Sequence, residues 1–392
     1  MAANFKKKSV PLSSRGQAVP RGSKLSISNN QLLVSSGVPS LDNIIGGGIP
    51  VGSLLLIEED THAIFSNILL RYFLAEGVIC KHGLSIVSAN ACTADEIFKK
   101  LPTPVDSDVM KPKSKAPREP DEKKNNEEEL KIAWRYQNLS SQEVTSNTVK
   151  FGHYYDLTTT MGDHHFSGLH ITKFISTNYT ETEPKQKNDK INPVCKALIS
   201  DIQNLIKNHN YSSAGSQPDK RILRLALNSF GSPLWSTFTS TDEMMSSISW
   251  FLLALRSILR NAFAVCLLTI PVHLFEDPSI SRRLEQCVDN AVRLESFGGS
   301  IKEHNPAFAD YDGLIHIKKK GRINCLAGHD IDTSDWAFKL KRKKFSIEKL
   351  HLPPELSETA SRAQLDAKKV KIQSGTPLCS SNPRTANKSL EF

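Results

Sequence analysis

The chain has 392 residues, of which 39% are hydrophobic, and a formal net charge of +9. No run approaches the roughly 18 apolar residues of a membrane-spanning helix, so we expect no membrane association. The basic N-terminus is not followed by an apolar stretch, and the seven cysteines form no C-x-x-C pair. These features argue against secretion and disulfides, and they predict a protein of the cytoplasm or nucleus.

Biased composition separates a core from its tails and insertions. Residues 1–28 are rich in Lys, Ser, Pro and Gly, and we predict a disordered tail there. Polar, proline-containing stretches at about 102–129 and 176–192 are predicted to be insertions within one core of residues 29–355. A second disordered tail is predicted at 356–392.

The first core element is a buried strand, Leu54–Ile57, that follows a glycine-rich turn at Gly46–Gly48. A turn of this kind before a buried strand is typical of RecA-type ATPases, in which the strand leads into a phosphate-binding loop. Such a loop needs the pattern G-x-x-x-x-G-K-[ST], because backbone N–H groups and a lysine hold the phosphates. This chain instead continues with Glu58, Glu59 and Asp60, and neither glycine nor lysine follows before Phe65. Two anions about 4 Å apart near a protein surface repel by about 4 kcal/mol. We therefore predict a degenerate phosphate loop that does not hydrolyse ATP.

Two interpretations of these acids remain open. A carboxylate at a helix N-terminus is favourable by about 0.3–1 kcal/mol, because the first N–H groups of a helix have no partner within it. Glu59 or Asp60 would then fill the place that a phosphate takes in active relatives. In the other interpretation the acidic side chains point into water.

The remaining core alternates apolar strands with helical patterns. A helix is predicted from Ile64 through Phe73, with a stop at Glu76-Gly77. Further helices are predicted over 194–206 and 248–259, and further strands over 84–87, 132–136, 222–227, 262–270, 288–294 and 314–317. This alternation predicts an α/β fold, a doubly wound and mostly parallel sheet with helices on both faces.

A second component of a nucleotide site is also altered. In active RecA folds, an Asp at the end of another apolar strand helps to hold magnesium through water. The corresponding position here, after the 222–227 strand, is Asn228, which lacks the charge. The two losses are consistent with each other, so we predict neither a cofactor nor a catalytic residue.

Two basic blocks follow in the chain. The first consists of Lys318, Lys319, Lys320 and Arg322, just beyond the last predicted strand. It has three open interpretations: contacts to a neighbouring subunit, contacts to RNA phosphates, or a solvated hairpin tip. The second block contains Lys341, Arg342, Lys343 and Lys344, and apolar residues alternate with basic ones around it. That pattern favours an edge strand with its cations facing outward, with a nuclear localisation signal as the competing interpretation.

One group of histidines superficially suggests a metal site. His164 and His165 follow Asp163, and His153 lies upstream. Their spacing matches no standard zinc pattern, so we expect exposed histidines and no metal.

Several segments taken together resemble the Elongator complex protein 4 family over about residues 30–356. They are SGVPSLDNIIGGGIPVGSLLLIEED, KIAWRY, FGHYYD, GSPLW, VRLESF, GLIHI and FKLKRKKFSIEKLHLPPE. The resemblance implies a RecA-like fold and a non-catalytic subunit of a hetero-hexameric ring with Elongator proteins 5 and 6. It also implies docking on the catalytic Elongator subcomplex, binding of tRNA and support of wobble-uridine modification, in the cytoplasm and nucleus. The alternative is a RecA-type ATPase whose rebuilt nucleotide site is completed by a neighbouring subunit.

Overall fold

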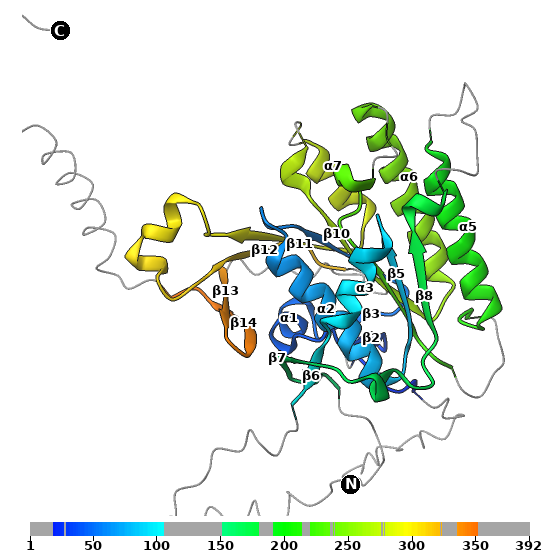
Figure 1. Ribbon diagram of the computed structural model, residues 1–392, viewed down its shortest axis with the longest axis horizontal. Helices are drawn as coiled ribbons and strands as arrows, with labels where there is room; N and C mark the ends of the chain where they lie inside the picture. The colour runs from blue at the N-terminus through cyan, green and yellow to red at the C-terminus, as the bar shows by residue number, and fades with distance from the viewer. Residues whose placement is uncertain are drawn as a thin grey trace, which may run out of the picture.

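The computed structural model describes residues 19–105, 151–179, 191–213, 220–321, 323 and 335–351, apart from 27–28, 236–237, 239, 276 and 278. The ordered elements form an α/β fold around one large sheet (Figure 1). The predicted strand at 132–136 and the predicted C-terminal tail at 356–392 lie outside the described residues. No helix in the described part of the chain combines the length and hydropathy needed to cross a bilayer.

Parallel strands make up most of a nine-stranded sheet. Their spatial order is β8 (Ile171–Ile175), β5 (Gly83–Ser88), β9 (Leu223–Leu227), β10 (Ala264–Ile270), β4 (Leu54–Glu58) and β11 (Asn290–Ser296). β4, β5, β9 and β10 are buried along their whole length, as expected for strands covered on both faces. Because the strands are parallel, the chain segments that follow β4, β9 and β10 emerge at the same edge of the sheet.

Antiparallel strands extend the sheet beyond β11. They are β12 (Gly313–Lys319), β13 (Trp336–Lys341) and β14 (Lys344–Lys349), with β14 at the edge. The prediction of one edge strand around the second basic block was therefore incomplete. Lys341 pairs with Lys344, so Arg342 and Lys343 form a two-residue turn between two strands. The basic residues lie at the tip of this hairpin.

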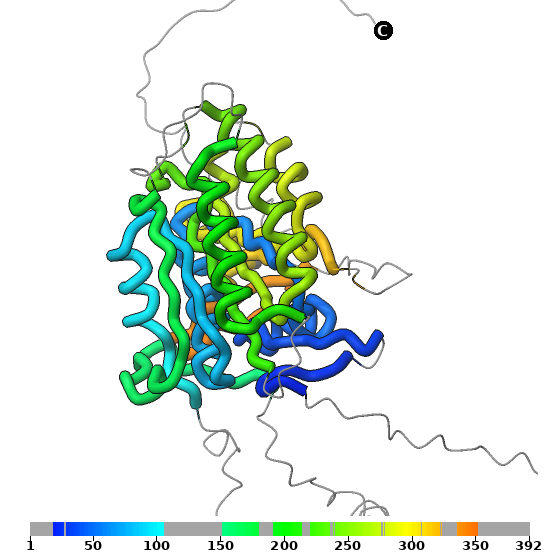
Figure 2. The backbone as a smooth tube through the Cα atoms, turned by 90° about the vertical axis from the view of Figure 1, so that its right-hand side faces the viewer, coloured from blue at the N-terminus to red at the C-terminus, as the bar shows by residue number. Residues whose placement is uncertain are grey.

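Helices cover both faces of the sheet, as predicted. One face packs against α1 (Pro39–Ile45), α2 (Ile64–Cys80) and α3 (Ala91–Lys99), and the other against α5 (Pro193–Asn208), α6 (Thr241–Arg260) and α7 (Ser279–Cys287). Figure 2 shows α5, α6 and α7 side by side over their face. Side chains of β4 alternate between the two hydrophobic cores: Leu55 and Ile57 enter the first, Leu54 and Leu56 the second. The prediction missed α1, α3 and α7, which are short.

Small accessory elements correct the predicted boundaries of the core. β1 (Ser23–Leu25) pairs with β2 (Leu32–Val34), and β2 pairs with β3 (Ile49–Pro50), so part of the predicted N-terminal tail is ordered. β6 (Pro102–Pro104) pairs with β7 (Tyr155–Thr160), so the first residues of the predicted 102–129 insertion form a strand. Short 3-10 helices are η2 (Asp163–Phe166), η3 (Ser176–Tyr179), η4 (Pro233–Trp235), η5 (Val272–Leu274), η6 (Ile301–His304) and η7 (Pro306–Phe308). Of these, η3 occupies the start of the predicted 176–192 insertion.

The predicted helix stop at Glu76-Gly77 is wrong, because α2 continues to Cys80. Gly77 is needed there because α2 lies too close to the sheet for a larger residue. A Cβ on Gly77 would lie 2.5 Å from Leu84 Cδ2 and 2.7 Å from Arg224 Cδ. Arg224 comes from the central strand β9 and is fully buried. The glycine therefore marks a close approach between helix and sheet, and the helix ends at Lys81 in a left-handed conformation.

Candidate functional site

The acidic loop, Glu58–Asp60, joins β4 to α2 at the carboxyl edge of the parallel strands. All three side chains are at least nine-tenths buried: Glu58 is 1% exposed, Glu59 6% and Asp60 1%. The interpretation that they point into water is therefore wrong. Each carboxylate has protein partners of a different kind.

Asp60 holds the start of α2. Its Oδ2 accepts a hydrogen bond from the backbone N–H of Ile64 at 2.9 Å, and its Oδ1 accepts one from Ser66 N–H at 3.0 Å. Its backbone carbonyl accepts from Ala63 N–H, and Ala63 has the left-handed φ of 53° that turns the chain into the helix. An anion thus occupies the N-terminus of α2, as expected where N–H groups lack partners within the helix. That anion belongs to the chain itself.

Glu58 forms an ion pair on the other side of the loop. Its Oε2 accepts from Arg293 Nε on β11, and its Oε1 accepts from Ser281 Oγ on α7 at 2.6 Å. Arg293 also donates to Ser281 Oγ at 3.0 Å. Ser281 Oγ also lies 3.3 Å from Glu285 Oε1, so the cluster extends to a second carboxylate on α7, and the Arg293 cation is already paired with Glu58.

Glu59 connects the two altered components of the nucleotide site. Its Oε1 accepts from Ser229 Oγ at 2.8 Å, and its backbone N–H donates to Ile270 O at the end of β10. Burial raises the pKa of Glu59, although hydrogen bonds from Thr269 and Ser229 oppose the rise. Asn228 precedes Ser229 and is 6% exposed, and its Oδ1 has no partner among the described residues. The structure therefore places Asn228 next to the acidic loop.

A cavity of about 390 Å³ lies beside the loop. Its lining includes Glu58, Glu59, His273, Arg293 and Glu295. Carboxylates outnumber cations on this wall, and Glu295 is paired with Lys302 and His316. A triphosphate placed here would meet carboxylates where it needs cations.

The first basic block is only partly exposed to solvent. Lys319 is the last residue of β12, and its Nζ donates to the carbonyl oxygens of Glu285, Gln286 and Val288 at the end of α7. This caps the carboxyl end of a helix, where a cation is favoured. Lys318 is exposed and Lys320 is half-buried, while Arg322 lies outside the described residues. Lys319 is therefore a structural residue, and Lys318 presents its charge to solvent.

The second basic block is exposed throughout. Lys341, Arg342, Lys343 and Lys344 surround the β13–β14 turn. Lys343 pairs with Asp156 at 3.2 Å, and Lys344 lies 5.0 Å from the centre of the Tyr154 ring. Such a hairpin tip, with an aromatic ring beside lysines, presents a cationic surface.

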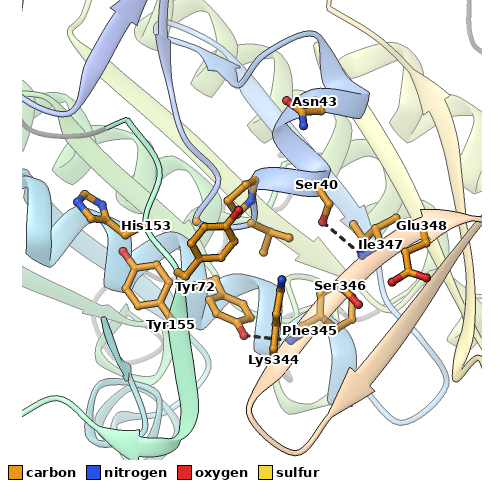
Figure 3. Close-up of a pocket in the computed structure, with 14 residues that line it drawn as sticks. Ser40, Asn43, Tyr72, His153, Tyr155, Lys344, Phe345, Ser346, Ile347 and Glu348 are labelled. Atoms are coloured by element: carbon orange, nitrogen blue, oxygen red, sulfur yellow. Dashed lines mark hydrogen bonds between the residues drawn. The ribbon is translucent and has the colours of Figure 1, made fainter. Parts of the chain in front are cut away.

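A cavity of about 280 Å³ lies behind the same hairpin (Figure 3). It is bounded by α1, by Tyr72 of α2, by His153–Tyr155 and by β14. Ser40 accepts from Ile347 N–H and Tyr72 accepts from Phe345 N–H, so α1 and α2 anchor β14. Figure 3 shows His153 and Tyr155 together at the end of this cavity away from Glu348.

A buried polar cluster between α2 and β9 was not predicted from the sequence. Glu76 and Arg224 are fully buried, and Glu76 accepts from Tyr155 O–H and from His153. Arg224 donates to His82 Nδ1 and to the carbonyl oxygens of Ser35 and Phe73. A single charged residue within the apolar segment Leu223–Leu227 was the signal that could have revealed it. The histidines that superficially suggested a metal site do not lie together: His164 and His165 stack on each other, and His153 contacts Glu76.

Comparisons with known proteins agree with the resemblance drawn from the sequence. A model of the PAXNEB protein family matches residues 16–392. The chain belongs to the PAXNEB family. It is 42% identical over 358 residues to Elongator complex protein 4 of Xenopus laevis, covering 87% of this chain and 85% of that protein. Elongator complex protein 4 of Danio rerio is 41% identical over 382 residues, covering 95% of this chain and 92% of that protein. The Homo sapiens protein of the same name is 39% identical over 353 residues, covering 87% and 82%. The family relationship thus supports an Elongator subunit.

Proposed function

We propose that this chain is a non-catalytic subunit of the Elongator complex, in a RecA-like ring with Elongator proteins 5 and 6. The observation that carries the non-catalytic part is the bonding of Asp60. The Ile64 and Ser66 N–H groups at the start of α2 are the donors that would bind a phosphate, and Asp60 already occupies them. A triphosphate would have to displace a buried carboxylate and then lie beside Glu58 and Glu59.

The ring assignment rests on the family relationship and on a sheet with helices on both faces. Its test is size-exclusion chromatography with light scattering on the full chain, alone and mixed with Elongator proteins 5 and 6. We expect a complex of higher mass that contains all three proteins. A lone monomer in the mixture would overturn the assignment.

The absence of nucleotide chemistry has a separate test. Calorimetry of the isolated full chain with MgATP should show no saturable binding. The same titration on the assembled complex should be unchanged by Asp60→Asn, because the substituted side chain lies in a site that takes no nucleotide. Saturable binding to the isolated chain would favour the rebuilt ATPase instead.

We assign tRNA contact to the β13–β14 hairpin tip, where Lys341, Arg342, Lys343 and Lys344 are exposed. Cations of this kind bind phosphates irrespective of sequence, and each contact makes binding weaken with salt. Such a subunit would support wobble-uridine modification by holding tRNA for the catalytic Elongator subcomplex, and we propose that it acts in the cytoplasm and nucleus. Loss of tRNA binding on neutralising the tip, with ring assembly intact, is the expected result. Unchanged affinity would leave the ring proposal standing and remove the hairpin from it.

A further inference from the structure

Three side chains with metal-binding atoms meet inside the protein, away from the acidic loop. Glu76 and Cys80 are one turn apart on α2 and therefore lie on the same face of the helix. His153 reaches them from the segment that precedes β7. One carboxylate oxygen, the thiol sulfur and one imidazole nitrogen all lie within 4.8 Å of one another. Among the described residues this is the one such group.

The separations between these atoms are those of ligands around a single small ion. Glu76 Oε1 lies 3.0 Å from His153 Nδ1 and 3.4 Å from Cys80 Sγ. Zinc binds oxygen and nitrogen at about 2.0–2.1 Å and sulfur at about 2.3 Å, so tetrahedral ligands lie roughly 3.3–3.7 Å apart. The third pair, Cys80 Sγ and His153 Nδ1, lies within 4.8 Å, so the three atoms can surround one zinc ion after side-chain movements of about 1 Å.

We propose that Glu76, Cys80 and His153 bind a zinc ion. The combination of thiolate, imidazole and carboxylate suits zinc better than magnesium or calcium, which prefer oxygen ligands alone. Binding forms a Zn–S bond and releases the thiol proton of Cys80 to solvent. Nδ1 of His153 gives up the proton that it donates to Glu76, which moves to Nε2 in a neutral ring or to solvent from an imidazolium, and the freed lone pair coordinates the metal.

Neighbouring groups hold the carboxylate in the orientation that this site needs. Tyr155 O–H donates to Glu76 Oε2 at 2.5 Å, and the backbone N–H of His153 donates to the same oxygen at 3.2 Å. Oε1 is the oxygen that faces both Cys80 and His153. Partners of this kind commonly orient the ligands of metal sites. Gly152 has a φ of 76°, which lets the chain turn so that His153 faces α2.

Zinc with one carboxylate and one thiolate is formally neutral, so the ion and these ligands add no net charge of their own. The buried guanidinium of Arg224 then adds one positive charge, which is the main electrostatic cost of binding. Arg224 lies nearby, but its guanidinium already donates to His82, Ser35 O and Phe73 O. It therefore does not depend on Glu76 as its hydrogen-bond acceptor. Of the three ligands, His153 lines the 280 Å³ cavity of Figure 3, so the imidazole is the ligand nearest to solvent on that side.

The site would join two segments that are far apart in the sequence. His153 comes soon after residues 106–150, and Glu76 and Cys80 lie in the middle of the core. A shared ion would fix the return of the chain onto α2 and β7. The role we infer is structural, because Glu76 and Cys80 are fully buried.

The test uses the purified full chain, stripped with chelator and then titrated with zinc or with cobalt as a spectroscopic probe. We expect one tightly held zinc per chain. With cobalt we expect a thiolate-to-metal charge-transfer band and the intense visible bands of a tetrahedral site. Cys80→Ser should abolish the charge-transfer band and raise the zinc Kd by about 100-fold or more, since loss of an outer partner alone costs about 10–100-fold.

Matched variants make the result specific. Cys92→Ser removes an exposed cysteine, and His164→Gln removes an exposed histidine, so neither should change the stoichiometry or the spectrum. His153→Gln should weaken binding while keeping the fold, as judged by circular dichroism, because its side chain is partly exposed. Less than one zinc per wild-type chain, or a band that disappears equally in Cys92→Ser, would overturn the proposal. If Cys80→Ser does not fold, the wild-type spectrum and the His153→Gln titration still decide.

Discussion

Replacement of Asp60 by alanine tests most directly whether this carboxylate fills the place of a phosphate at the start of α2. In the native chain, Asp60 accepts from the N–H groups of Ile64 and Ser66. Ile64 is 52% exposed, so water can replace its acceptor, whereas Ser66 is 1% exposed and its N–H would remain buried without one. An unpaired buried donor costs about 1–3 kcal/mol, and the lost interaction with the helix N-terminus adds about 0.3–1 kcal/mol or somewhat more.

Together these terms predict that Asp60→Ala lowers the free energy of unfolding by about 1–4 kcal/mol. For a core of this size the melting temperature should fall by roughly 3–16 °C. Asp60→Asn should cost less, because its remaining oxygen still accepts from Ser66. Asp163→Asn is the matched control, since Asp163 is exposed and surface substitutions stay within about 0.5 kcal/mol.

Thermal and urea denaturation of the full chain measure the effect, and added sulfate shows whether the vacated place is an anion site. Sulfate stabilises most proteins by exclusion from their surface, so the comparison is with wild type. Asp60→Ala should gain more from sulfate than wild type does, because the freed N–H groups can bind it. A variant as stable as wild type, or one with no extra response to sulfate, would refute the view that Asp60 substitutes for a phosphate.

Three further results are expected. Burial raises the pKa of Glu59 above its ordinary value, so its charged form reduces stability at neutral pH and stability is gained as pH falls through the raised pKa. Glu59→Gln should therefore raise the melting temperature at pH 7, with an advantage that shrinks as pH is lowered, and an advantage that grows would contradict this. Gly77→Ala should destabilise by about 1–3 kcal/mol despite alanine's better helix propensity, because its Cβ meets Leu84 and Arg224; a higher melting temperature would count against the close approach. Neutralising all four cations of residues 341–344 in the assembled complex should weaken the salt dependence of tRNA binding. The slope of the logarithm of the binding constant against the logarithm of salt concentration should become smaller in magnitude by about 2–4. The control is Lys100→Gln with Lys173→Gln, which removes two lysines in surface ion pairs and should leave this slope unchanged.

The main elements of the sheet could be predicted because their apolar runs are long. Leu54–Ile57, 84–87 and 222–227 all fall within observed strands or extend them by one residue, since a strand covered on both faces needs continuous apolar sequence. The helix over 194–206 followed from its apolar spacing, and the helix over 248–259 followed from its strongly apolar sequence. The local sequence pattern was sufficient to predict strands and helices whose burial repeats regularly along the chain.

Predictions failed where contacts between distant residues decide the structure. Gly77 resembles a helix stop in sequence, and only the position of Arg224 shows that it provides space. The turn at Arg342-Lys343 contains no glycine or asparagine to indicate it, so the hairpin was predicted as a single strand. The partners of the acidic loop come from β11, α7 and the end of β9. No pattern near Glu58 could have identified them.

On the proposal that the acidic loop replaces a phosphate-binding loop, its bonding goes beyond the loss of one lysine. If only the lysine had been lost, the N–H groups at the start of α2 would lack an acceptor, and water or an adventitious anion would have to supply it. In this chain Asp60 supplies the acceptor, Arg293 and Ser281 satisfy Glu58, and Ser229 satisfies Glu59. Restoring a glycine and a lysine would therefore leave these bonds competing with a nucleotide. On the same proposal a carboxylate at position 228 would have no magnesium to hold, and the neutral amide of Asn228 next to Glu59 avoids a further buried charge.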